Sequence, residues 1–256
     1  MAEQPLIEVT RDHFVTVLRL NRWQARNAIN RATASALREA WQAFEADEQA
    51  RVGILTGGDQ VFCAGADLRD LDGLAEDAEG PHGPLGLTRL VGNKPMIAAI
   101  AGYCVAGGLE LACWCDLRIA DESALFGCLE RRFGVPLIDG GTQRLPQIIG
   151  LGRALELILT ARVVPAAEAL SMGLVNEVVA PGQSLARAIE LSQQIASFPQ
   201  TCLRNDRQAV YRGLGQELAA GLKLEAALGI YSLRSGEALE GALQFQSGKG
   251  RKGSLE

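Results

Sequence analysis

Two segments of the chain place small residues where a strand is expected to turn into a helix. The first spans residues 61–68 (VFCAGADL) and the second spans residues 101–112 (AGYCVAGGLELA). Small residues let a ligand approach the main chain, and unpaired N–H groups at a helix start attract a carbonyl oxygen or an anion. We therefore predict backbone donors at residues 64–66 and at Gly107-Gly108. The alternative for the first segment is a tight turn in which Asp67 caps a helix.

Two glutamates lie twenty positions apart, one within the second segment and one beyond it. Glu110 falls in the first turn of the expected helix, where apolar neighbours predict burial, and a buried carboxylate needs a reason. Glu130 follows in residues 124–136, and one helix, one turn and one strand between the two would return the chain to the same cavity. Paired carboxylates in a dry site have pKa values pushed apart, which gives one acid and one base. The alternatives are a surface residue matching the helix dipole for Glu110 and a solvated charge cluster for Glu130.

The elements that must position these residues alternate between short apolar strands and longer helices. The predicted strands cover residues 6–10, 13–20, 52–55, 96–101 and 117–120. Helices are predicted from Arg31, with Asn30 as N-cap, and over residues 107–115. This alternation indicates an α/β architecture, in which active sites favour strand-to-helix turns.

The last third of the chain has a helical pattern and no strand signal. Helices are expected over residues 154–160, 166–172, 185–196, 201–213, 216–233 and 237–245. Residues 72–86, which combine Gly and Pro with acidic residues, are predicted to form a mobile surface loop.

Composition and charge exclude several classes of protein. The chain has 256 residues, 48% of them apolar, so it can bury a substantial core and is not intrinsically disordered. No apolar run reaches the length of a membrane helix, and a net charge of −5 gives no general attraction for nucleic acids. We see no signal peptide and expect a cytoplasmic protein with reduced cysteines. Cys113 and Cys115 lack a second ligand pair at metal-binding spacing, so we expect no metal site.

Four motifs in register resemble the enoyl-CoA hydratase/isomerase (crotonase) superfamily. They are LNR at residues 20–22 with RNAIN at 26–30, FCAGADL at 62–68, KP at 94–95 leading to AGGLEL at 106–111, and residues 126–146. The resemblance covers about residues 6–245. It implies a crotonase-like α/β core of repeated ββα units over residues 1–195, with the acyl-CoA site, and a helical oligomerisation region over residues 196–256 in a homotrimer or a dimer of trimers.

The resemblance also implies an activity, because family members bind acyl-CoA thioesters and stabilise a thioester enolate with two backbone amides. By position these are the amides of Ala66 and Gly107, which are assigned as catalytic together with Glu110 and Glu130. Hydratases of the family keep both glutamates, so an enoyl-CoA hydratase is expected: Glu110 activates the water added at C3 and Glu130 exchanges the proton at C2. No cofactor is implied apart from the coenzyme A of the substrate. The positions implied in its binding are Arg26, Ala28, Ala64, Ala66, Asp67, Leu68, Arg69 and Gly107.

The chain departs from the family pattern after Glu130. Where hydratases commonly have Gly-x-x-Pro-Gly-x-Gly-Gly, residues 134–141 read GVPLIDGG, which adds a third carboxylate at Asp139. Asp139 either resembles the extra acid of dienoyl-CoA isomerases or caps a helix over residues 140–149. The alternatives to hydration are therefore an enoyl- or dienoyl-CoA isomerase that uses Glu130 and Asp139, and a non-catalytic acyl-CoA-binding protein.

Overall fold

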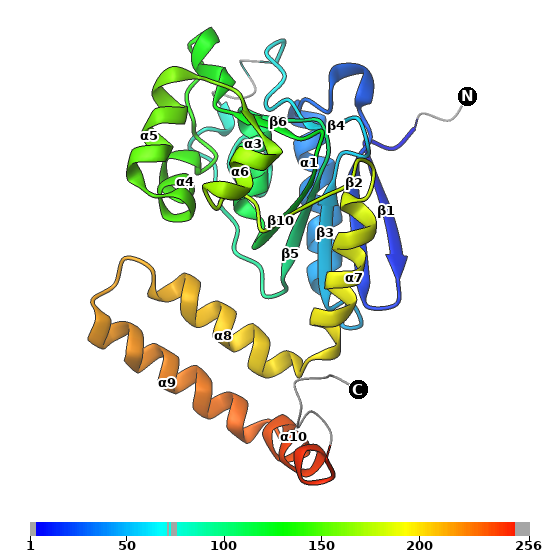
Figure 1. The fold of residues 1–256 in the computed structure, drawn as a ribbon, viewed down its shortest axis with the longest axis vertical. Coiled ribbons are helices and arrows are strands. Elements are labelled where there is room, and N and C mark those ends of the chain that lie inside the picture. The colour runs from blue at the N-terminus through cyan, green and yellow to red at the C-terminus, as the bar shows by residue number, and fades with distance from the viewer. Residues whose placement is uncertain (1–3, 71, 73–75, 249–256) are drawn as a thin grey trace. The chain divides into compact units, whose positions relative to one another are not determined.

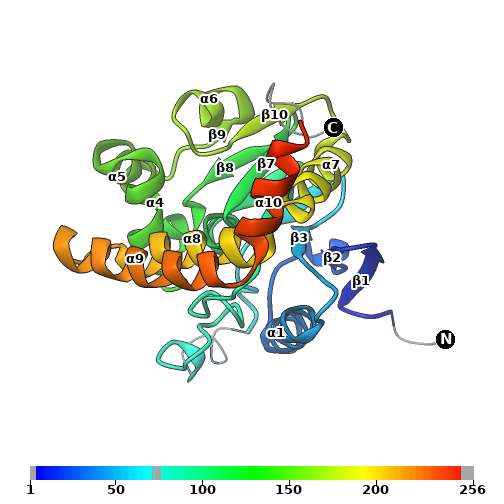
Figure 2. The ribbon, with the colours of Figure 1, turned by 90° about the horizontal axis from the view of Figure 1, so that it is seen from below.

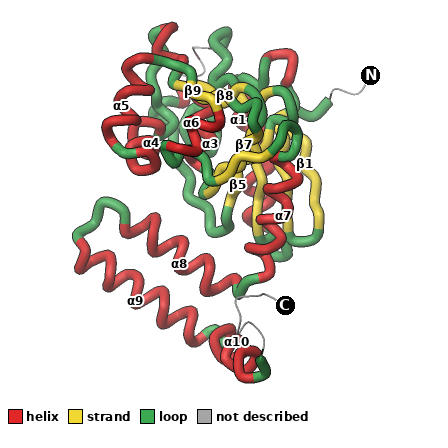
Figure 3. Tube along the Cα trace, in the orientation of Figure 1, coloured by secondary structure: helices red, strands yellow, loops and turns green. Residues whose placement is uncertain are grey.

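The computed structural model describes residues 4–70, 72 and 76–248. The chain divides into two compact units, Met1–Ile195 and Ala196–Glu256, which are described separately below. The N-terminal unit carries the strands and the C-terminal unit is helical, as the colouring by secondary structure in Figure 3 makes clear.

A six-stranded sheet with the order β1-β2-β3-β5-β7-β10 forms the centre of the described part of the N-terminal unit (Figure 1). Only the hairpin of β1 and β2 is antiparallel in it; the other pairs are parallel. Every residue of β3 and β5 is buried, which explains their continuous apolar sequences. The strands are β1 (Ile7–Asp12), β2 (Val15–Leu20), β3 (Val52–Thr56), β5 (Met96–Ile100), β7 (Leu117–Asp121) and β10 (Glu177–Val179). The first five confirm the predicted strands.

A second sheet has the order β4-β6-β8-β9 within the described residues. Its strands are short: β4 (Val61–Cys63), β6 (Tyr103–Val105), β8 (Leu125–Gly127) and β9 (Val164–Pro165). The segments that follow β4, β6 and β8 are the ones that the sequence analysis singled out. Because β4 pairs with β6 and β6 with β8 in parallel, the ends of these three strands lie at one edge of the sheet, which brings the segments together. β9 and β10 correct the expectation that the last third contains no strand; at two and three residues they are too short to leave a periodic signal.

Helices α1 (Arg31–Ala46) and α7 (Ser184–Ser197) lie on opposite faces of the larger sheet (Figures 1 and 2). The buried residues of α1 recur every three or four positions, at Thr33, Ala34, Leu37, Trp41 and Phe44. As predicted, Asn30 caps α1: its Oδ1 accepts a hydrogen bond from the Thr33 N–H at 3.0 Å. α3 (Gly107–Trp114) is buried along its whole length and carries Glu110 into the interior.

The remaining helices of the N-terminal unit are short. Those whose bounds lie wholly within the described residues are the 3₁₀ turns η1 (Trp23–Ala25) and η2 (Leu129–Phe133), followed by α4 (Gly141–Ile149), α5 (Leu151–Thr160) and α6 (Ala166–Ser171). The predicted loop at residues 72–86 lies partly outside the described residues, and its end corrects the prediction: residues 83–86 are buried.

The C-terminal unit contains α8 (Gln200–Gly213), α9 (Leu218–Arg234) and α10 (Glu237–Gln246). α8 and α9 form a hairpin, in which the Asn205 Nδ2 donates to Ser232 Oγ at 2.9 Å. The Glu237 carboxylate at the start of α10 accepts from the N–H groups of Thr201 and Cys202, which are otherwise free at the start of α8. Among the described residues, no helix is both long and apolar enough to cross a membrane.

Candidate active site

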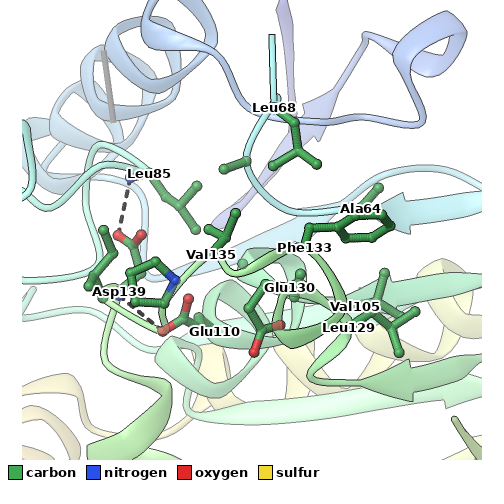
Figure 4. Close-up of a pocket in the computed structure, with 15 residues that line it drawn as sticks. Ala64, Leu68, Leu85, Val105, Glu110, Leu129, Glu130, Phe133, Val135 and Asp139 are labelled. Atoms are coloured by element: carbon green, nitrogen blue, oxygen red, sulfur yellow. Dashed lines mark hydrogen bonds between the residues drawn. The ribbon is translucent and has the colours of Figure 1, made fainter. Parts of the chain in front are cut away.

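A pocket in the N-terminal unit collects most of the candidate residues at the ends of β4, β6 and β8 (Figure 4). It encloses about 720 Å³ of empty space, part of it open to solvent. Its polar side chains are those of Glu110, Glu130 and Asp139, and the rest of its lining is apolar side chains and backbone. The lining residues are Ala64, Ala66, Leu68, Leu85, Val105, Ala106, Gly107, Glu110, Leu129, Glu130, Phe133, Val135, Pro136, Ile138 and Asp139.

Two stretches of backbone meet at one side of this pocket. A Cβ atom on Gly65 would lie 2.7 Å from the nitrogen of Gly107, and a Cβ on Gly107 would lie 3.4 Å from the nitrogen of Ala66. Ala106, with φ 53° and ψ −130°, turns the chain into α3 in a backbone conformation that is costly for a residue other than glycine. The Ala66 and Gly107 N–H groups make no hydrogen bond with any described group. They are therefore available to a ligand oxygen.

Cys63 and Asn27 hold the first of these two stretches. The Cys63 Sγ accepts from the Gly65 N–H at 3.3 Å and donates to the Asn27 carbonyl oxygen at 3.1 Å. Burial raises the pKa of this thiol to about 12, so it keeps the proton that it donates. The Asn27 Nδ2 donates in turn to the carbonyl oxygens of Gly57 and Val61. The sequence patterns had not singled out either side chain as a support, because these contacts join segments far apart in the chain.

Asp67 does not begin a helix, which corrects the sequence-based expectation. It lies in a turn in which the Asp70 N–H donates to the Asp67 carbonyl oxygen at 2.9 Å. Its carboxylate pairs with Arg22 Nη1 at 2.7 Å and with Arg69 Nε at 3.1 Å. Burial alone would raise the pKa of Asp67, but the hydrogen bonds from Arg69 and Arg22 lower it to about 2. Asp67 therefore fixes the turn after Ala66.

Glu110 is the more enclosed of the two predicted catalytic carboxyls, with 3% of its surface exposed. Its Oε1 accepts hydrogen bonds from the N–H groups of Gly141 at 2.8 Å and Asp139 at 3.0 Å. Burial, together with the neighbouring carboxylates of Asp139 and Glu130, raises the pKa of Glu110 to about 8 despite these two donors. A Cβ on Gly141 would lie 2.9 Å from Oε1, so a larger residue at this position would displace the Glu110 carboxylate.

Glu130 lies on η2 at the same pocket, and it is not the solvated surface charge of the alternative interpretation. Only 6% of its surface is exposed, and neither carboxylate oxygen has a hydrogen-bond partner among the described residues. Burial raises its pKa above the ordinary value for glutamate. An unpartnered buried carboxyl group is costly, so this side chain has unused capacity to bind a hydrogen-bond partner from outside the described residues.

Asp139 does not cap α4, which corrects one of its two sequence interpretations. The N-cap of α4 is Gly140, and no side chain caps it. The Asp139 Oδ1 instead accepts from the Leu85 N–H at 3.1 Å and from the Thr88 hydroxyl. Burial raises the pKa of Asp139, and the Thr88 and Leu85 hydrogen bonds oppose this.

The residues expected to bind coenzyme A divide into two groups. Ala64, Ala66, Leu68 and Gly107 line the pocket. Arg26, Ala28, Asp67 and Arg69 do not, but the Arg26 carbonyl oxygen accepts from the Ala64 N–H at 3.1 Å, so this loop borders the pocket. Arg26 and Arg69 extend exposed side chains. Among the described residues, no group of three or more His, Cys, Asp or Glu side chains is arranged to hold a metal ion.

The apolar part of the pocket could not be assigned from sequence patterns. Leu85 comes from the loop before β5, and Val135, Pro136 and Ile138 come from the loop before α4. The run from Gly134 to Asp139 had signalled a departure in sequence, but which of its side chains face the pocket depends on the path of the loop.

Two backbone donors beside two buried carboxyls are suited to proton transfer next to a carbonyl group, and here they lie on an α/β core with two sheets. The model of the enoyl-CoA hydratase/isomerase family matches residues 10–249. A probable enoyl-CoA hydratase of Rhizobium meliloti is 42% identical over 217 residues, 84% of each chain. A crotonyl-CoA hydratase of Syntrophomonas wolfei is 37% identical over 231 residues, 88% of each chain. The crystal structure of an enoyl-CoA hydratase of Mycobacterium marinum matches with a TM-score of 0.90 at 33% identity, covering 95% of this chain and 96% of that one. The chain belongs to the enoyl-CoA hydratase/isomerase family and has the crotonase fold.

Proposed function

We propose that the protein is an enoyl-CoA hydratase that adds water in a syn manner across the double bond of a 2-enoyl-CoA thioester. The observation that carries this proposal is that Glu110 and Glu130 are both buried and line the same pocket. Ala66 and Gly107, whose N–H groups make no hydrogen bond with a described group, line it too. The relatives whose names specify hydration, such as the crotonyl-CoA hydratase of Syntrophomonas wolfei, support the same activity.

In this proposal the thioester oxygen accepts hydrogen bonds from the N–H groups of Ala66 and Gly107. Negative charge grows on that oxygen as an enolate forms, so donors already in place stabilise the transition state more than the substrate; one such donor contributes about 3 kcal/mol. No side chain is needed for this step.

The two glutamates divide the proton transfers. Glu110 accepts a proton from the water whose oxygen bonds to C3, and Glu130 donates a proton to C2. The reaction therefore starts with Glu110 ionised and Glu130 protonated. The two N–H groups that donate to Glu110 Oε1 favour its carboxylate form, but burial still holds its pKa at about 8, so the fraction of Glu110 able to accept a proton increases up to about that pH. Burial raises the pKa of Glu130 and so favours its protonated form, although the Glu130 backbone and the charge of Arg131 partly oppose this.

The substrate in this proposal brings coenzyme A with it, and no further cofactor takes part. The backbone at Ala64 and at residues 66–69 receives the adenine and pantetheine, and the exposed Arg26 guanidinium meets a phosphate. We place the enzyme in the cytoplasm, because Cys63, Cys104, Cys113, Cys115 and Cys128 are buried thiols that suit a reducing compartment.

We also propose that the protein forms a homotrimer or a dimer of trimers through its helical C-terminal unit. α8, α9 and α10 expose more large apolar side chains than water-facing helices need, among them Val210, Leu218, Leu222, Ile230, Tyr231, Leu233, Leu239, Leu243 and Phe245. Light scattering after size exclusion tests this: three or six copies of the 27.3 kDa chain support it, and a monomer at micromolar concentration contradicts it.

The experiment that tests the activity is the loss of the ultraviolet band of the enone thioester in crotonyl-CoA. We expect rapid loss with the wild type and a reduction of 10²-fold to 10⁴-fold in kcat for Glu110→Gln and for Glu130→Gln. Glu122→Gln, an exposed glutamate on the same unit, is the matched control and should retain full activity. If Glu110→Gln binds and reacts like the wild type, hydration by this pair is refuted and a non-catalytic acyl-CoA-binding role is favoured.

A second candidate is an enoyl- or dienoyl-CoA isomerase, favoured by the position of Asp139 in the same pocket. That enzyme moves a double bond with Glu130 and Asp139 exchanging the proton. Turnover of a 3-enoyl- or dienoyl-CoA substrate without turnover of crotonyl-CoA would replace the hydratase proposal with this one.

A further inference from the structure

The side chain of Asp139 fastens a loop that forms part of the pocket wall. Its Oδ1 accepts from the Leu85 N–H at 3.1 Å and from the hydroxyl of Thr88. Leu85 is fully buried and faces the pocket, as Figure 4 shows together with its hydrogen bond to Asp139. The loop comes so close here that a Cβ on Gly83 would lie 2.5 Å from Thr88 Oγ1 and 2.9 Å from Asp139 Oδ1.

The backbone of the same residue supports the proposed base. The Asp139 N–H donates to Glu110 Oε1 at 3.0 Å, beside the donor at Gly141. Arg144 closes this arrangement from α4, because its guanidinium donates to the carbonyl oxygens of Asp139 at 3.0 Å and of Thr88 at 2.5 Å. One residue thus contacts the pocket wall through its side chain and Glu110 through its main chain.

We propose that Asp139 is a positioning residue. It connects the pocket wall at Leu85 to the backbone cradle of Glu110, which is formed by the N–H groups of Asp139 and Gly141, and so holds the Glu110 carboxylate in place relative to the acyl group. The inference rests on the proposed hydratase function. Asp139 acts here as a hydrogen-bond acceptor and transfers no proton to the substrate, in contrast to the isomerase alternative.

The inference predicts which substitutions at Asp139 are tolerated. Asparagine has the same shape and still presents an Oδ1 that accepts from Leu85 and Thr88, so Asp139→Asn should lose no more than about threefold in kcat on crotonyl-CoA. Asp139→Ala releases both donors and lets the cradle of Glu110 move, and displacements of about 1 Å at a reacting group cost on the order of 10²-fold. We therefore expect Asp139→Ala to lower kcat by about 10-fold to 100-fold with a smaller effect on KM.

Thr88 offers a second and independent variant, because it does not line the pocket. Thr88→Val removes the hydroxyl that donates to Asp139 and should lower kcat by roughly threefold to tenfold, whereas Thr88→Ser keeps a hydroxyl and should recover most of this loss. The Thr88→Val and Asp139→Ala effects should combine to less than their product, because both break the same link.

Hydrogen exchange followed by mass spectrometry tests the connection that Asp139 makes between residues 85–88 and residues 139–141, and it does not depend on turnover. In Asp139→Ala, amide exchange should accelerate both at residues 85–88 and at residues 139–141, and in Asp139→Asn it should match the wild type in both segments. Unchanged exchange in Asp139→Ala would overturn the proposal even if the enzyme is a hydratase. Equal loss of kcat in Asp139→Asn and Asp139→Ala would also overturn it, in favour of proton transfer by Asp139. If the wild type does not hydrate crotonyl-CoA, the hydratase function fails and the exchange experiment alone decides the link.

Discussion

Replacing Glu110 with glutamine should stabilise the folded protein at alkaline pH while abolishing the proposed reaction. Glu110 is 3% exposed, and burial raises the pKa of its carboxyl group from 4.5 to about 8. A glutamate whose pKa is raised by folding holds its proton more tightly in the folded state. It therefore imposes almost no penalty below pH 4.5. The penalty grows as the pH rises from 4.5 to about 8 and stays constant above that.

The size of this effect follows from the shift in the pKa of Glu110. Each pKa unit corresponds to 1.36 kcal/mol, so the change from 4.5 to about 8 amounts to about 5 kcal/mol once the pH exceeds 8. Glutamine has nearly the same shape, carries no charge at any pH, and keeps an oxygen to accept from the N–H groups of Asp139 and Gly141. The variant should thus escape most of this penalty.

Urea unfolding at fixed protein concentration, repeated between pH 5 and pH 9, measures the difference directly. We expect Glu110→Gln and the wild type to differ little at pH 5, and the variant to become more stable by several kcal/mol at pH 9. Glu122→Gln, on the exposed surface, should follow the wild type throughout. If the free energies of unfolding of Glu110→Gln and the wild type change with pH in parallel, the argument that burial raises the pKa of Glu110 is refuted.

Three further predictions concern the backbone around the pocket. Gly65→Ala places a Cβ 2.7 Å from the Gly107 nitrogen at a φ of +93°, so it should lower kcat on crotonyl-CoA by at least about 10²-fold, measured with the same ultraviolet assay. Asp67→Asn weakens the pairing with Arg22 and should lower the free energy of unfolding by about 1–2 kcal/mol at pH 7; since the pKa of Asp67 falls from 3.8 to about 2 on folding, the difference should shrink as the pH is lowered through this range in urea titrations. Asn27→Ala leaves the buried carbonyls that Asn27 serves without a donor and should cost about 2–4 kcal/mol in urea, whereas a loss under 0.5 kcal/mol would contradict this role.

Sequence patterns predicted the parts of the fold that depend on local periodicity. The buried face of α1 and the apolar strands β3 and β5 follow from residue spacing alone, and so does the burial of Glu110 on a helix apolar on all sides. β9 and β10 were missed because two or three residues do not make a period.

Partners that depend on distant loops were outside the reach of sequence patterns. Asp67 and Asp139 are both chemically suited to cap a helix, and each was assigned that possible role. In the structure Asp67 meets Arg22 and Asp139 meets Leu85, more than forty positions away in each case. Which acceptor a short carboxylate serves is decided by the packing of distant loops, and the sequence alone does not state it.

The order of strands in the larger sheet has a consequence for how the chain is made. β7 lies between β5 and β10, and Ile119 pairs with Glu177, so the edge of β7 stays open until the ribosome has delivered residues far beyond it. Such distant parallel pairings form late and slowly, and an open apolar strand edge recruits other chains. A nascent chain halted before residue 177 would therefore carry Glu110 and Glu130 on an unfinished sheet, and we expect it to depend on chaperones or to aggregate.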